Sequence, residues 1–140
     1  MQVTQVDERD SGWEDDAPRF RVYLHGSGET STAGWTDTYD ITGADVLQAI
    51  DWAQRQAREQ LIYAVALVRD DADPDRLGHG AGRGLVWLVG MDGNDVTNDH
   101  DDRVTQARML ARRQNPVGIP EADRAPWDVS NPYAHDAEER

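Results

Sequence analysis

Two apolar runs that lie close together dominate the pattern of hydrophobic and polar positions. Residues 61–68 and 85–89 are apolar at both alternate sets of positions, and a loop rich in Asp, Gly and Arg separates them. A strand that is apolar on both faces is typical of the interior of a sheet that is covered on both sides. We therefore predict two neighbouring central strands, and we expect the core of the domain to be built on them.

Two further strands are predicted before these runs, because apolar and polar residues alternate in residues 19–25 and again in residues 35–41. Alternation with a period of two is the pattern of a strand with one buried face. The first strand places Phe20, Val22 and Leu24 on that face. The glycine-containing segment between the two strands indicates a hairpin.

Two helices are predicted because apolar residues recur at helical spacing in two segments. The first runs from Asp45 to about Gln60, with Thr42 as its N-cap and Asp45 as the acid of a capping box. Its apolar stripe consists of Val46, Ala49, Ile50, Ala53 and Ala57, and Trp52 beside it is expected to be half exposed. The second helix ends at about Gln114, before Pro116, and its acidic start and arginine-rich end match the helix dipole. Its stripe consists of Val104, Ala107, Leu110 and Ala111.

The order ββαββα predicts a small single α+β domain over residues 19–114, with a mainly antiparallel sheet and the helices on one face. A β-grasp-like or related arrangement is the expected architecture. Residues 1–18 are expected to be a disordered acidic arm, because so few apolar groups cannot offset the entropy of ordering. Residues 115–140 are a Pro-containing irregular tail, and their aromatic side chains, Trp127 and Tyr133, indicate docking on the second face of the sheet or on a partner.

Charge and composition exclude several classes of function. The chain has 27 acidic residues, 14 Arg and no Lys, and a net charge of -13, which argues against direct binding to nucleic acid or to anionic membranes. No apolar run approaches the roughly 20 residues that span a bilayer, and the N-terminus lacks the pattern of a signal peptide, so we expect a cytoplasmic protein. The absence of Cys and Lys removes disulfides, thiolate nucleophiles, Schiff-base lysines and Walker lysines. We expect no cofactor.

Residues 25–29 place His25, Ser27 and an acid next to each other at a strand end, where glycine amides could act as an oxyanion hole. The Gly-x-Ser-x-Gly spacing of a nucleophile elbow is absent, and neighbours in sequence rarely reach the geometry of a triad. A turn is the preferred interpretation, with His25 and Ser27 as weak catalytic candidates.

Residues 78–84 are rich in glycine, as phosphate-binding loops are. The third glycine of the Gly-x-Gly-x-x-Gly fingerprint is missing, and the segment precedes a strand instead of opening a helix. A hairpin tip is the preferred interpretation. An anion contact through His79 and Arg83 is the alternative, and His79 is a third weak catalytic candidate.

Two acidic segments are weak candidates for a divalent metal. Asp71, Asp73 and Asp75 are spaced like the start of a calcium loop, but an Arg and a Gly occupy the positions of the turn glycine and of the bidentate Glu. Asp99 and His100 lie in an acidic cluster that fits no metal signature. Helix capping and solvation explain these residues with fewer assumptions, so we expect no metal.

Aromatic residues that the predicted core does not need are the candidate interaction residues. They are Trp13, Trp35, Tyr39, Trp127 and Tyr133. Because the chain combines these residues with an acidic balance and no catalytic signature, we predict a non-enzymatic protein-protein interaction module. Its class would be that of an inhibitor or immunity-type protein that binds a basic partner.

Two other functions remain open from the sequence. The first alternative is a structural or assembly subunit, of phage or mobile-element type, that self-associates as a homo-oligomer through the open sheet face and the tail. The second is a small hydrolase-like enzyme that uses His25, Ser27 or His79.

Overall fold

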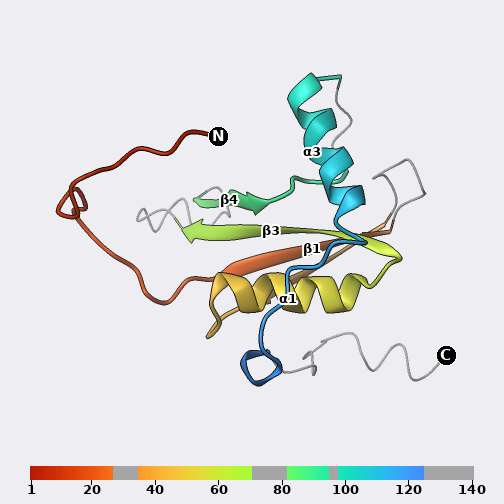
Figure 1. Cartoon of the computed structure of the whole chain (residues 1–140), viewed down its shortest axis with the longest axis horizontal. Helices are drawn as coiled ribbons and strands as arrows, with labels where there is room; N and C mark the ends of the chain where they lie inside the picture. Colours follow the sequence, from red (N-terminus) through yellow and green to blue (C-terminus); the bar gives the residue numbers. More distant parts are fainter. Residues whose placement is uncertain (27–34, 71–81, 95–97, 125–140) are drawn as a thin grey trace.

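Four strands form one antiparallel sheet with the order β2-β1-β3-β4 in this computed structural model, which describes residues 1–26, 35–70, 82–94 and 98–124 (Figure 1). The strands are β1 (Phe20–Gly26), β2 (Thr36–Ile41), β3 (Leu61–Asp70) and β4 (Arg83–Val89). Two helices, α1 (Val46–Ala57) and α3 (His100–Ala111), and a 3-10 turn, η1 (Glu121–Asp123), complete the described elements. The predicted α+β class and the order ββαββα are confirmed.

The two helices lie on opposite faces of the sheet, so the prediction that both pack on one face is wrong (Figure 1). α1 packs on the face that carries Tyr63, whereas Met109 of α3 packs on the face that carries Ile62. Consecutive residues of a strand point to opposite faces, so these neighbours in β3 separate the two layers. In a β-grasp sheet the central strands run parallel, whereas β1 and β3 pair antiparallel here, which leaves a related ββαββ arrangement.

α1 buries the alanine side of its surface together with one large aromatic ring. Asp45 is the N-cap: its side chain accepts from the Gln48 amide at 2.8 Å, and the Gln48 side chain accepts from the Asp45 amide at 2.9 Å. The predicted cap at Thr42 is therefore wrong by three residues. Trp52 is 5% exposed and meets Tyr39 edge-on at 5.3 Å, so its predicted half exposure is also wrong. The side chain of Val46, predicted to be buried, is exposed.

Only one of the two apolar runs is central in the sheet. β3 lies between β1 and β4, and residues 62–66 of β3 are all buried, as predicted. β4 pairs with β3 alone in the part of the chain that the structure describes, so the prediction of a second central strand is wrong. The core therefore fills the space between the first three strands and α1, and β4 is left at the margin.

The described part of the tail runs along α1, and it does not cover the sheet (Figure 1). The Val117 amide donates to Gln54 Oε1 at 3.0 Å, and Gln48 Nε2 donates to the carbonyl oxygen of Asp123 at 2.7 Å. Trp127 and Tyr133 lie outside the described residues.

The N-terminal arm contains neither helix nor strand, and its residues are exposed from Met1 to Ala17. Neither α1 nor α3 is long and apolar enough to cross a membrane.

Candidate functional site

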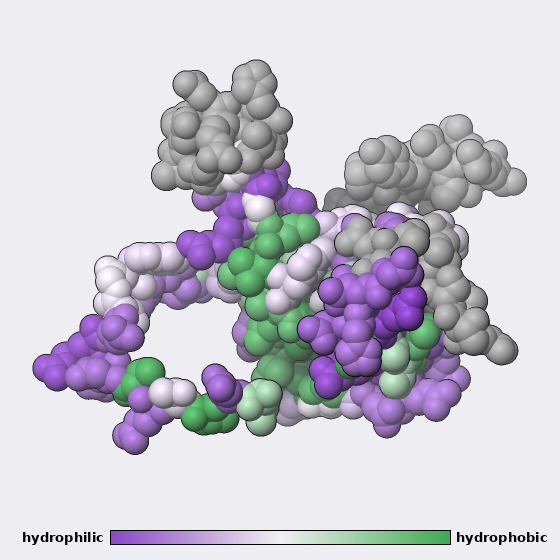
Figure 2. Space-filling view, turned by 90° about the horizontal axis from the view of Figure 1, so that it is seen from above, coloured by the Kyte–Doolittle hydropathy of each residue, from purple (hydrophilic) through white to green (hydrophobic). Residues whose placement is uncertain are grey.

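The β4 edge, which we define as residues 85–89 on the unpaired side of β4, exposes apolar side chains. Val86 is 45% exposed and Leu88 is 42% exposed, while Leu85, Trp87 and Val89 are half-buried. Figure 2 shows a strip of apolar surface beside the polar end of α3, where Figure 1 places β4. An apolar strand edge of this kind has backbone donors and acceptors with no strand to pair with.

A bulge shapes this edge. Val65 pairs with Val89 and Ala66 pairs with Trp87, so Leu88 is an extra residue on β4. The bulge places Trp87 on the face of α3, where its ring lies 5.1 Å from that of Tyr23, and it leaves Val89 on the face of α1. Bulges are frequent at sheet edges, where they redirect side chains. The extra residue of the bulge, Leu88, has an exposed side chain.

α3 is docked on the sheet by its second half only. Met109 is 1% exposed and is the one buried residue of the helix. The predicted apolar stripe is wrong at Val104, Ala107 and Ala111, which are exposed or only half-buried in the structure. The first turns of α3 extend past β4 in Figure 1 and border the apolar strip in Figure 2. This end of the helix is acidic: Asp99 caps the amides of Asp101 and Asp102 at 2.8 and 3.3 Å.

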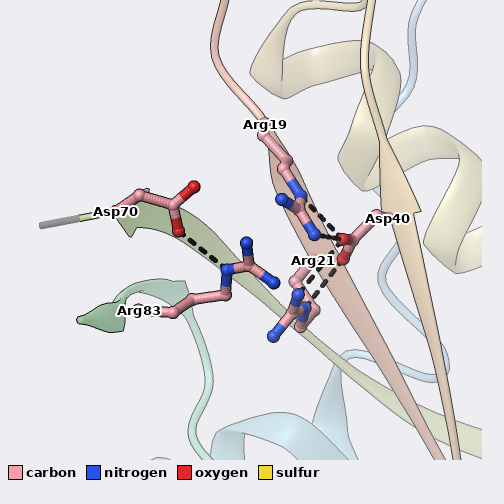
Figure 3. A network of polar contacts seen from close by, with 5 residues as sticks. All are labelled: Arg19, Arg21, Asp40, Asp70 and Arg83. Atoms are coloured by element: carbon pink, nitrogen blue, oxygen red, sulfur yellow. Dashed lines mark hydrogen bonds and ion pairs between the residues drawn. The ribbon is translucent and has the colours of Figure 1, made fainter. Parts of the chain in front are cut away.

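A network of five charged residues marks the opposite end of β4 (Figure 3). Its members are Arg19, Arg21, Asp40, Asp70 and Arg83. Arg21 and Arg19 both bind Asp40, each through an Nε contact of 2.7 Å, and the hydrogen bond from Arg21 is the main cause that lowers the pKa of Asp40. Arg83 Nε donates to Asp70 at 2.7 Å and lowers the pKa of that carboxyl.

This charged network has a positional role. Asp70 and Arg83 are the end pair of the β3–β4 ladder, so their ion pair helps to set where β4 begins. Ion pairs that are this exposed contribute little to stability, because water and salt screen the attraction. Every carboxylate of the network is already bound to a guanidinium group, and the five residues together carry three guanidinium groups and two carboxylates.

His25 is fully buried and serves as a link between strands. Its Nε2 accepts from the Gly93 amide at 3.2 Å, and its Nδ1 lies 3.0 Å from Thr36 Oγ1. Because Nε2 is an acceptor, the proton of the neutral ring is assigned to Nδ1, which donates to Thr36. Burial lowers the pKa of His25, and Asp92 opposes this shift to a smaller extent. The ring therefore ties β1 to β2 and to the turn after β4.

Of the other predicted catalytic and metal candidates, Asp99 and His100 lie among the described residues. Ser27, His79, Asp71, Asp73 and Asp75 lie outside those residues. The side chain of Asp99 caps α3, and His100 is the exposed first residue of that helix. No group of three potential metal-ligating side chains occurs in the described ranges.

Three of the predicted interaction aromatics, Trp13, Trp35 and Tyr39, are described, and none of them belongs to the β4 edge. Trp13 is exposed, and Arg69 stacks over its ring at 5.0 Å. Trp35 is also exposed and covers Gly26, where a Cβ would overlap the indole. Tyr39 packs on the core, and burial is the main cause that raises its pKa. The sequence reasoning placed Val86 and Leu88 in the core and so missed them. The sequence did carry one signal of an edge open to pairing, because residues 84–89 contain none of the charges or prolines that usually protect an edge strand.

A hollow of about 650 Å³ lies between the N-terminal arm and the start of α1. It is lined by Asp16, Ala17, Pro18, Phe20, Gly43, Ala44, Asp45, Val46 and Gln48. Its two carboxylates, those of Asp16 and Asp45, belong to the arm and to the helix cap, and none of the catalytic candidates lines it.

Comparisons with protein-family models, with curated proteins and with solved structures find no match to this chain.

Proposed function

We propose that this chain is a non-enzymatic protein-interaction module that binds a basic protein partner through the β4 edge. The observation that carries the proposal is the exposure of Val86 and Leu88 on a strand whose outer side has no partner among the described residues. Exposed apolar surface that is rimmed by polar residues is a common mark of a binding site for another protein.

The contrast between the two edges of the sheet supports this assignment. β2 carries Asp37 and Asp40 within its six residues, and acids of this kind discourage pairing with another strand. β4 has its only charge at Arg83, and that charge is engaged by Asp70. The fold therefore protects one edge and leaves the other suited to a partner.

Charge supports a basic partner. The net charge of -13 gives the chain an attractive field for cations over a distance of about 8 to 10 Å at ordinary salt. The same charge opposes close approach of a second copy, which weighs against self-assembly as the primary function. An antiparallel pair of β4 edges related by a two-fold axis would nevertheless be self-complementary, so self-association is the second candidate.

The position of His25 supports a role without catalysis. A general base must come within hydrogen-bond reach of its substrate. The ring of His25 has no exposed surface, and its nitrogens are engaged by Thr36 and Gly93. Its chemistry is accounted for by the link that it makes within the sheet.

Affinity capture from a lysate of the native cells tests the proposal. The captured proteins should be basic, and capture should fall as salt rises from about 0.1 to 0.5 M. The pair Val86→Thr and Leu88→Thr places strand-compatible β-branched side chains at both positions, removes apolar surface and changes no charge, so it should abolish capture. Leu47→Gln is the matched control, because Leu47 is 50% exposed on α1. Equal capture by both variants, or capture that survives high salt, would contradict the proposal.

A further inference from the structure

We infer that the partner supplies an extended segment that pairs antiparallel with β4, and that basic residues precede the apolar run of this segment. This inference rests on the proposed function. It adds the form of the partner, its direction and the order of its charges along the chain.

The backbone of β4 is the first argument. The strand has seven residues, and its pairing partners all lie in β3. The amides and carbonyls that point away from β3 therefore have no strand opposite them in the described residues. An added strand satisfies such groups directly, and this mode of peptide recognition combines main-chain hydrogen bonds with side-chain pockets at alternate positions. The rest of the sheet is antiparallel, and an antiparallel addition would continue it.

The side chains of β4 fix the character of the middle of the segment. Leu85 and Trp87 point to the face of α3, and Val86 points to the face of α1. Neighbouring side chains on an antiparallel pair lie about 4.5 to 5.5 Å apart on the same face. The incoming segment would then gain most from apolar or β-branched residues at its centre, because it meets apolar neighbours on both faces.

The charges at the two ends of β4 fix the direction of the segment. At the end near Val89, the projecting start of α3 carries Asp101 and Asp102 (Figures 1 and 2). At the other end, the network contains three guanidinium groups and two carboxylates, so its described residues offer no free carboxylate to a basic partner (Figure 3). Basic residues of the partner therefore belong at the α3 end. An antiparallel strand begins beside the end of its neighbour, so these residues come first in the partner segment.

Two peptides of identical composition test the inference on the whole chain. In one, two arginines precede an alternating run of Val and Thr; in the other, the arginines follow that run. Binding is measured by fluorescence anisotropy, and hydrogen exchange reports protection of the amides of β4. The first peptide should bind about tenfold more tightly and should slow exchange in β4. Equal affinity, or binding without protection of β4, would overturn the inference.

Charge variants give an independent readout. The pair Asp101→Asn and Asp102→Asn should weaken the arginine-first peptide about fivefold and should reduce its preference over the reversed peptide. Asp37→Asn, on the protected edge β2, is the control and should leave both affinities unchanged. An equal effect of both variants would show that net charge alone attracts the peptide, which would overturn the predicted direction.

The inference and the proposed function fail in different ways. Capture of a basic protein that depends on Val86 and Leu88, with no preference between the two peptides, would leave the function intact and refute strand addition. Absence of any captured partner would refute the function. Protection of β4 in the chain alone that rises with concentration, together with a dimer in sedimentation, would identify a second copy as the occupant and overturn the inference.

Discussion

The buried ring of His25 should make the stability of the domain depend on pH below the ordinary pKa of histidine. Nε2 accepts a hydrogen bond from the Gly93 amide, so protonation at this nitrogen would set two donors against each other in a site without solvent. The pKa of His25 is lowered from 6.5 because burial disfavours the charged ring. In the unfolded chain the ring takes up its proton near 6.5. Between these two values unfolding binds a proton, and the free energy of unfolding falls as pH falls.

The size of this effect follows from proton linkage. One proton taken up on unfolding gives a slope of at most about 1.4 kcal/mol per pH unit. The stability that depends on the neutral ring of His25 is fully present above pH 6.5. It declines as pH falls from 6.5 toward the lowered pKa of the folded state, and it does not change further below that pKa. Asp40 and Asp70 affect the stability of the domain in a separate pH range. Because their pKa values are lowered in the folded state, the stability that their ionised forms contribute is lost only as pH falls below about 4.

Urea unfolding at a series of pH values from about 5 to 8 measures this slope. His25→Gln keeps a polar side chain but does not titrate, so the variant should be less stable above 7 and should have a flatter profile below it. Two parallel profiles would refute the reasoning, because they would mean that the ring of His25 has the same pKa in the folded and unfolded states.

Three further predictions concern packing contacts and an ion pair. Met109→Ala should cost about 2 to 5 kcal/mol in urea unfolding, because Met109 is the one buried residue of α3, whereas Val104→Ala on the exposed side should cost under about 0.5 kcal/mol. Gly90→Ala should lower the free energy of unfolding more than Gly43→Ala in the same assay. Both glycines have a positive φ, but a Cβ at Gly90 would lie 3.2 Å from Cγ of Met109, whereas a Cβ at Gly43 would have no atom within 4 Å. Asp51→Asn should speed proteolysis of residues 115–124, because the buried Asp51 carboxylate lies 3.6 Å from Arg124 Nε in that segment. An unchanged cleavage rate would mean that the other contacts of the segment hold it in place.

The order of the elements could be predicted because each depends on local pattern. Alternation in β1 and β2, and the alanine spacing of α1, are properties of short windows. The cap of α1 was misplaced because both Thr42 and Asp45 are good capping residues, and the choice between them depends on which acceptor has Gln48 three residues later. The face on which α3 packs depends on the path of the chain after β4, and no local period records that path.

The structural role of His25 could not be predicted for a related reason. The hydrogen bonds of His25 join residues that are 11 and 68 positions apart in the chain, so its role as a link could not be read from its neighbours Gly26 and Ser27. The burial of Asp51, which is 4% exposed, could not be read from the sequence either, because a carboxylate on a helix normally indicates solvent exposure. Its carboxylate pairs with Arg55, one helical turn later, at 2.8 Å, which is the spacing at which helical side chains meet.

The apolar pattern of β4 has a different explanation from that of β3. Residues 62–66 of β3 are apolar on both faces because α1, α3 and two strands surround them. β4 has the same pattern but pairs with one strand among residues 1–26, 35–70, 82–94 and 98–124, and Val86 and Leu88 are exposed. Such a pattern is costly at a free edge, since it favours unwanted pairing. It is the appropriate pattern if a fifth strand is added, because β4 then becomes an interior strand with paired backbone on both sides. The proposed partner segment would thus supply the neighbour that the sequence of β4 predicts and that the chain itself, in its described residues, does not provide.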